Sequence, residues 1–161
     1  PNASAVKFFY DEVFSKITDQ SVIFSIIGKK AGSLGLDTDK RVRTTEFIKD
    51  IRQAYYEADV FVSPIQIGGG TNFKILEAMA TGLPIVTFSD RVKDIGAKNM
   101  QDVLTADNAQ SFYEQVSLLL DDEALGKKLS ENARKIIEEK FSWVIIGSHL
   151  SATWKNIYEK T

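Results

Sequence analysis

Short apolar runs alternate with segments of helical pattern along this chain, and that alternation limits the folds it can adopt. The runs that predict strands are residues 22–27, 41–45, 60–62, 85–88 and 102–105. The segments with helical character are residues 3–16, 50–58, 72–81, 109–120, 122–139 and 142–158. Strands alternating with helices are typical of βαβ units and a parallel sheet. We therefore expect an α/β fold, a Rossmann-like parallel sheet flanked by helices, with a C-terminal helical tail.

Several of these elements carry finer predictions. The continuous apolarity of residues 22–27 predicts a strand that is buried on both faces. The apolar residues that form one stripe on the first helix are Val6, Phe9, Tyr10, Val13 and Ile17. Asp50 is expected to cap the helix over 50–58. The residues of that helix expected to point inward are Ile51, Ala54 and Tyr55. Gly82 is a natural C-terminal cap for the helix over 72–81.

The composition suits a globular domain and excludes several classes of protein. Of the 161 residues, 43% are hydrophobic and 26% are charged, so the chain can bury a core. The formal net charge of −2 argues against broad, sequence-independent binding of nucleic acid. The absence of cysteine excludes a disulfide scaffold, a thiol nucleophile and a Cys-ligated zinc site, and it fits a reducing cytoplasm.

The organisation of the chain is simple. It has no linker or internal repeat, so residues 1–161 are expected to form a single domain. No apolar run approaches the roughly 20 residues needed to span a bilayer, and no signal peptide opens the chain. The first residue is Pro1 rather than Met, so we expect this sequence to be a piece of a longer protein.

Three consecutive glycines, Gly68, Gly69 and Gly70, lie between a predicted strand and the predicted helix over 72–81. Glycine leaves backbone N–H groups uncovered, and a helix N-terminus adds unpaired donors and the positive end of its dipole. Such a segment forms an anion pocket, most often for phosphate. Neither GxGxxG nor the GxxxxGK[ST] pattern is present, so the glycines alone do not identify the ligand.

Two charged residues follow the glycines. Lys74 lies in the first helical turn, where a cation is misplaced unless an anion binds beside it. Glu77 lies one turn further, where a carboxylate can accept hydrogen bonds from neighbouring hydroxyls such as those of a ribose. The alternative is that Lys74 and Glu77 are surface residues that form a loose ion pair.

Residues 67–86, IGGGTNFKILEAMATGLPIV, strongly resemble the donor-site signature of glycosyltransferase family 4, the group 1 transferases of GT-B architecture. Residues 59–64 resemble the strand that precedes this signature in the family. Ala133-Arg134 and Phe141-Ser142-Trp143 resemble its C-terminal helices. Pro1-Asn2 resembles the pair that follows the first strand of the C-terminal half in one branch of the family. The resemblance thus covers nearly the whole chain.

The resemblance implies the C-terminal half of a two-domain glycosyltransferase. In the family this half holds a nucleotide-diphosphate sugar and the N-terminal domain holds the acceptor. The implied partners are a UDP- or GDP-type sugar donor and the N-terminal domain, and the implied reaction is transfer of a hexose to a glycan, lipid or other acceptor. Family members usually retain anomeric configuration and need no metal, so no cofactor is expected. The acceptor domain is absent from this sequence, so the chain alone is expected to be inactive. The implied location is the cytoplasm, or peripheral to the inner face of the membrane.

The resemblance also implies roles for individual residues. The residues of the loop and of the helix start would face the diphosphate and the sugar. They are Gly68, Gly69, Gly70, Thr71 and Asn72. Lys74 would lie beside the phosphates and stabilise charge on the departing diphosphate, which makes it the implied catalytic residue. Glu77 corresponds to the second glutamate of the E-x7-E motif, which resembles a ribose-binding carboxylate.

The chain departs from the family pattern in three places. The first glutamate of E-x7-E would fall at Gly69, which leaves no carboxylate there for the sugar hydroxyls. The basic pair that clamps the diphosphate would precede Pro1. The run after Phe88 is SDRVKDI, where the family often has a Glu-Gly pair.

A non-catalytic nucleotide-binding or regulatory α/β module is the alternative function. A phosphorelay receiver with Asp90 as the phosphoacceptor is one version, but its acidic metal-binding pair would have to be Asp11-Glu12, which lie in a predicted helix. Asp37-Thr38-Asp39 matches a metal-binding D-x-D pattern, but the glycines and basic residues around it predict a polar surface turn.

The predicted tail carries three further features. Its apolar stripe, which predicts core or an inter-domain contact, is Trp143, Ile146, Leu150, Trp154 and Ile157. His149, the one histidine in the sequence, is expected to be packed or solvated rather than a general base. Lys127 and Lys128 are expected on a solvated face, with a weak contact to a membrane surface as the alternative.

Overall fold

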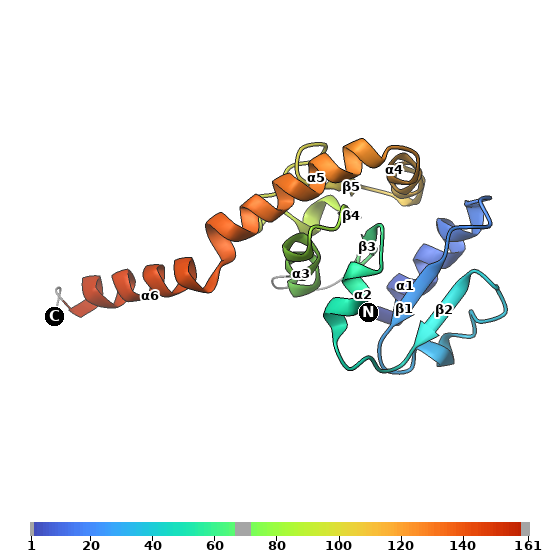
Figure 1. The fold of residues 1–161 in the computed structure, drawn as a ribbon, viewed down its shortest axis with the longest axis horizontal. Helices are drawn as coiled ribbons and strands as arrows, with labels where there is room; N and C mark the ends of the chain where they lie inside the picture. The colour runs from blue at the N-terminus through green and yellow to red at the C-terminus, as the bar shows by residue number, and fades with distance from the viewer. Residues whose placement is uncertain (1, 67–71, 159–161) are drawn as a thin grey trace.

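The computed structural model describes residues 2–66 and 72–158 and has the predicted α/β class (Figure 1). The strands within these residues are β1 (Phe24–Ile27), β2 (Val42–Thr45), β3 (Phe61–Ser63), β4 (Ile85–Phe88) and β5 (Leu104–Ala106). All pairings are parallel. The pairs β3–β4 and β4–β5 form one sheet, and β1–β2 form another. The expected parallel strands are therefore present, but they lie in two groups rather than in one continuous sheet.

Helices connect and follow the strands, as predicted. Their bounds are α1 (Asn2–Glu12), α2 (Ile51–Tyr56), α3 (Phe73–Thr81), α4 (Ala109–Asp121), α5 (Glu123–Ile136) and α6 (Trp143–Tyr158). Short 3₁₀ turns lie at η1 (Phe14–Lys16), η2 (Ala31–Leu34) and η3 (Ser89–Arg91), and a π-helical turn lies at η4 (Ile137–Phe141). The predicted helix over 3–16 is thus an α-helix followed by a 3₁₀ turn, and the one over 122–139 changes to a π turn after Ile136.

Local signals explain where several helices begin and end. Asp50 accepts a hydrogen bond from Arg52 N and caps α2, as predicted. The Asn108 side chain accepts from Ser111 N in a capping box at the start of α4. Gly82 ends α3 with a φ of 78°, a left-handed conformation that glycine adopts without strain.

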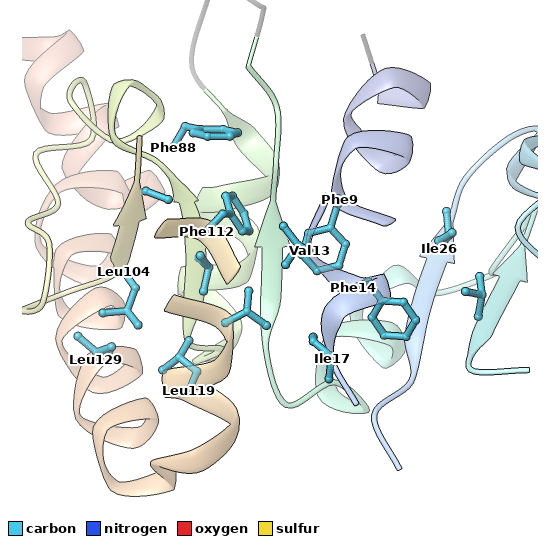
Figure 2. Packing of buried hydrophobic residues seen from close by; sticks show 14 of the residues in the cluster. Phe9, Val13, Phe14, Ile17, Ile26, Phe88, Leu104, Phe112, Leu119 and Leu129 are labelled. Carbon is cyan, nitrogen blue, oxygen red and sulfur yellow. The ribbon is translucent and has the colours of Figure 1, made fainter. Parts of the chain in front are cut away.

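The core has two parts that lie on opposite faces of β4. Val86 and Phe88 belong to a cluster with residues of α1, α4, β1 and β2, whereas Ile85 belongs to a cluster with residues of α3 and the loop before β5. This alternation follows from the period of two along a strand. In Figure 2 the labelled side chains of the first helical segment, Phe9 to Ile17, lie between Ile26 of β1 and Phe112 of α4. The first helix therefore links the two groups of strands.

Two burial predictions are wrong. Residues 22–27 do not form a strand buried on both faces, because Ile26 is buried while Ser25 and Ile27 are exposed. The reason is that the first helical segment packs on the face that carries Ile26, whereas within the described residues neither core cluster includes a residue of the opposite face of β1. Ile51 does not point inward either, since it occupies the first position of α2 and is 45% exposed, whereas Tyr55 on the same helix is buried as predicted.

The apolar stripe of the tail is not part of the core of this chain. None of the α6 residues is buried, and the exposed fraction reaches 86% at Trp143 and 70% at Trp154. The helix extends away from the rest of the molecule and has no element beside it along most of its length (Figure 1). The core interpretation of this stripe is therefore wrong, and the inter-domain interpretation stays a prediction. No helix within the described residues is long and apolar enough to cross a membrane.

Candidate functional site

Residues at the carboxyl ends of β4 and β5, together with Gln66 after β3, line a cavity of ≈ 250 Å³ at one edge of the three-stranded sheet. Its lining residues are Gln66, Phe88, Ser89, Asp90, Arg91, Ala106 and Asp107. Phe88 and Ala106 are the last residues of β4 and β5. Ligands of parallel α/β sheets bind at this kind of edge. Gln66 lies two residues before Gly68, so the cavity is close along the chain to the segment where the sequence predicts an anion site.

Charged side chains surround this cavity. Arg91 donates from its Nη2 to the backbone oxygen of Gln66 at 2.9 Å, which ties the β4–β5 loop to the segment after β3. Lys93 forms an ion pair with Asp90. The hydrogen bond from the Lys93 ammonium holds the pKa of the Asp90 carboxyl below its ordinary value. The cavity therefore has a polar rim in which both signs of charge are present.

The first turn of α3 has the features of an anion site. Asn72 is the N-cap, but its side chain does not accept a hydrogen bond from the helix, unlike the caps of α2, α4 and α5. Its backbone oxygen accepts from Ile75 N and Leu76 N. The first turn contains no acidic residue, and the Lys74 side chain is exposed. The positive end of the helix dipole and the Lys74 cation are thus left without a carboxylate in that turn.

Glu77 has a partner that no local pattern in the sequence predicts. Its Oε2 accepts a hydrogen bond from Tyr55 Oη of α2 at 2.9 Å. Burial, followed by this bond to Glu77, raises the pKa of Tyr55 well above its ordinary value. No ion pair joins Lys74 and Glu77 within the ranges that the structure covers, so the predicted alternative of a loose pair between them is not seen. Lys74 is therefore not neutralised by Glu77 within the described residues.

The structure accounts for some predicted site residues and not for others. Asn72, Lys74 and Glu77 lie together on the first two turns of α3. Gly68, Gly69, Gly70 and Thr71 lie outside the described residues, and their predicted contacts stay predictions. The helical spacing predicts that Tyr55 points inward but not that it bonds to Glu77, because no local pattern links residues 22 positions apart. No sequence pattern connects residues 88–91 with residues 106–107 on the neighbouring strand either.

The residues considered as metal ligands or as a general base are not gathered into a site. Asp39 accepts hydrogen bonds from the backbone and side chain of Arg41, which hold the pKa of its carboxyl below the ordinary value. Asp37 is exposed, as the predicted polar turn requires. His149 is an exposed residue of α6. Among the described residues, no group of three or more histidine or carboxylate side chains is arranged to hold a metal ion.

Comparison with known proteins identifies the family. The family model described as glycosyl transferases group 1 matches residues 1–122. The chain belongs to this family. Among curated proteins, this group 1 chain is similar to spore coat protein SA of Bacillus subtilis, with 29% identity over 138 residues, 82% of this chain and 35% of that protein.

Solved structures similar to this group 1 chain share its fold. A glycosyltransferase from Rickettsia africae matches with a TM-score of 0.79 and 17% identity, over 93% of this chain and 44% of that chain. Anabaena Alr3699/HepE, in complex with UDP, matches with a TM-score of 0.79 and 18% identity over the same shares. The C-terminal domain of a group 1 protein from Francisella tularensis matches with a TM-score of 0.59 and 21% identity, over 71% and 60%. These matches show the GT-B fold, and the Francisella structure among them is itself a C-terminal domain.

The chain is short relative to these proteins. It spans about a third of the length of the Bacillus relative, 35%, and 44% of the Rickettsia and Anabaena chains. The matched proteins therefore contain much more sequence than this group 1 domain does.

Proposed function

We propose that this chain is the donor-binding domain of a glycosyltransferase that moves a hexose from a UDP- or GDP-type sugar nucleotide to a glycan, lipid or other acceptor. The observation that carries the proposal is the start of α3. There, an N-cap whose side chain makes no cap bond and an exposed Lys74 stand beside the glycine segment. A diphosphate at this point would be bound by backbone N–H groups, the helix dipole and the Lys74 ammonium.

Two further observations support this assignment. Gln66, which lies six residues before the N-cap of α3, lines the cavity at the ends of β4 and β5, and we propose that the sugar of the donor contacts the polar groups of this cavity. Anabaena Alr3699/HepE has been solved in complex with UDP and with UDP-glucose, and its fold matches that of this domain. A UDP-type donor is therefore the first ligand to test.

The mechanism that we propose is electrostatic. Negative charge develops on the diphosphate as the bond to the sugar breaks, and Lys74 with the amides of residues 68–72 would stabilise that charge. Lys74 is accordingly the proposed catalytic residue, and Glu77 is proposed to accept hydrogen bonds from the ribose. We propose that the reaction retains the anomeric configuration, that it requires no metal, and that residues 1–161 alone are inactive without an acceptor domain. Binding of UDP that survives EDTA and an absence of sugar transfer by the isolated chain are the expected results.

Replacement of Lys74 tests the assignment. Loss of a charge-assisted hydrogen bond costs about 1.5–3 kcal/mol, so Lys74→Ala should weaken UDP binding about ten- to a hundredfold. Binding of uridine, which carries no phosphate, should change little. Calorimetry with both ligands measures the difference.

Lys128→Ala is the matched control, because Lys128 is an exposed helical lysine on α5 rather than on α3. It should bind UDP like the parent. If Lys74→Ala also binds UDP like the parent, Lys74 is a solvated surface residue and the proposed phosphate site is wrong. If affinity for uridine falls as much as affinity for UDP, Lys74→Ala has disturbed the fold of the site and has not removed a phosphate contact.

We also propose a cytoplasmic location for the protein. The cysteine-free sequence fits a reducing compartment. The alternative is a peripheral location, with a weak contact between the inner face of the membrane and Lys127 and Lys128, whose side chains are exposed on α5. Cell fractionation distinguishes the two locations. Recovery of the protein with membranes at low salt and its release at high salt would favour the peripheral location.

A further inference from the structure

Glu77 is an exposed residue whose carboxylate is held by a buried group. Tyr55 Oη donates to Glu77 Oε2 at 2.9 Å. Within the described residues, Oε1 of the same carboxylate accepts no hydrogen bond. One oxygen of Glu77 is thus fixed by the protein and the other is available to a ligand.

The ring that makes this bond has little freedom. Tyr55 is 9% exposed and belongs to the core cluster that contains Ile75 and Met79 of α3. Its ring centroid lies 5.7 Å from that of Phe61 on β3. Because α3 and β3 both restrain the ring, the hydroxyl has a defined position. A long exposed glutamate samples several rotamers, and a bond to a fixed donor reduces that number.

The charge state of the pair suits this arrangement. Burial and the bond to Glu77 both raise the pKa of Tyr55, so the phenol keeps its proton and remains a donor at neutral pH. A protonated phenol beside a carboxylate donates to it and does not repel it. The phenol is therefore able to donate to Glu77 at neutral pH.

We propose that Tyr55 is a positioning residue for Glu77, holding one carboxylate oxygen so that the other is directed at the ribose hydroxyls of the donor nucleotide. This inference rests on the proposed function, because it takes the ribose as the partner of Glu77. It assigns to Tyr55 a share in the preference for a ribonucleotide over a 2′-deoxyribonucleotide. Tyr55 itself does not contact the ligand in this arrangement.

The test compares two ligands that differ by one hydroxyl. Calorimetry on the full-length protein would give the Kd for UDP and for 2′-deoxy-UDP. Tyr55→Phe keeps the packed ring and removes only the donor, so UDP binding should weaken about two- to tenfold. Binding of 2′-deoxy-UDP should change by less than a factor of about two. Tyr56→Phe is the matched control, since Tyr56 is the next residue and is 72% exposed. It should leave both affinities unchanged.

A second pair of variants separates positioning from stability. In a Glu77→Gln background, Tyr55→Phe should cause no further loss of UDP affinity, because the group that it positions has already been altered. Equal losses for the two ligands, no loss for either, or a Tyr55→Phe protein that does not fold would each overturn the proposal. The last of these would show that the hydroxyl serves the fold.

The outcome also distinguishes this inference from the proposed function. If Glu77→Gln weakens UDP binding and Tyr55→Phe does not, Glu77 contacts the ribose without help from Tyr55, and only the positioning role fails. If Glu77→Gln binds UDP like the parent, neither residue serves the ribose. The phosphate contact of Lys74 would still be decided by Lys74→Ala.

Discussion

The strands β4 and β1 have similar apolar sequences and very different surroundings. Residues 85–88 read Ile-Val-Thr-Phe and residues 24–27 read Phe-Ser-Ile-Ile. All four residues of β4 are buried, whereas Ile26 alone is buried in β1. β4 has a hydrogen-bonded strand on each side, and β1 has one. An apolar run therefore predicts a strand, but the elements packed against its two faces decide how much of it is buried. Residues of β4 belong to both core clusters, whereas Ile26, the buried residue of β1, belongs to one.

The backbone shows the same contrast. Phe24 N donates to Arg41 O and Gly28 N to Thr45 O, so the alternate N–H groups of Ser25 and Ile27 point to the side of β1 away from β2. Phe61 N donates to Pro84 O, so Val62 N–H points away from β4. Within the described residues these three N–H groups have no strand to pair with. The two groups of strands thus each have one unpaired edge next to the first helix.

The largest expected effect of this difference is in hydrogen exchange. In the chain of residues 1–161, the amides of β4 should exchange only through global opening, which for a domain corresponds to about 5–15 kcal/mol. The amides of Ser25, Ile27 and Val62 should exchange through openings that cost little. Exchange followed by NMR at single-residue resolution measures both sets. Slow exchange at Ser25 and Ile27 would show that another strand covers this edge.

Truncation of one isoleucine on each strand should show the next largest difference. Ile85 is fully buried, so Ile85→Ala should lower the free energy of unfolding by about 2–5 kcal/mol. Ile27 is 37% exposed, so Ile27→Ala should cost about 1 kcal/mol or less. Urea denaturation of the two variants and the parent provides the measurement. Equal losses would mean that both strands contribute equally to the core.

A buried hydroxyl gives a smaller effect. Thr87 Oγ1 of β4 donates to the backbone oxygen of Ser63 at 3.0 Å, and Thr87 is fully buried. Thr87→Val keeps the shape and removes the donor, which should cost about 1 kcal/mol. Thr45→Val, at an exposed position of β2, should stay within about 0.5 kcal/mol of the parent. Thermal and urea unfolding would compare them, and a neutral Thr87→Val would contradict the expected role of this bond.

The smallest effect on stability is expected from protonation of Asp39, close to the start of β2, at acid pH. Arg41 donates to Asp39, and its Nη1 also donates to Ile17 O at 2.6 Å, so this pair ties β2 to the end of the first helical segment. Hydrogen bonds from Arg41 lower the pKa of Asp39 in the folded state. A lowered folded pKa gives stability that is present above the unfolded value of about 3.9 and is lost as the pH falls through the folded value.

Asp39→Asn should therefore be less stable than the parent at neutral pH and equal to it at a pH below the folded pKa of Asp39. Unfolding measured from pH 7 down to acid pH would show the two curves converge. Asp37→Asn, at an exposed position two residues away, is the control and should follow the parent throughout. A constant difference between Asp39→Asn and the parent at every pH would assign the effect to something other than the charge.

Some features of the candidate site depend on residues close together in the sequence, and others depend on residues far apart. The start and end of α3, with Lys74 and Glu77 on its first two turns, could be predicted because the glycines, the helical spacing and Gly82 lie within 15 residues of one another in the sequence. The bond from Tyr55 to Glu77 could not be predicted, because it depends on the packing of α2 against α3, and the cavity could not, because it depends on the pairing of β4 with β5. No spacing rule connects such residues along the chain.

The amino-acid sequence is enough to predict the α/β class, the order of the strands and helices, the cap residues Asp50 and Gly82, and the family. Each of these depends on interactions between residues close together in the chain or on the identity of a short motif. The arrangement of the elements in space was needed to show that β1 is half exposed, that the apolar stripe of α6 is uncovered within the described residues, and that Tyr55 donates a hydrogen bond to Glu77. Burial and long-range hydrogen bonds depend on which elements become neighbours in space. The type of a residue and its neighbours along the chain do not show which distant residue it will contact.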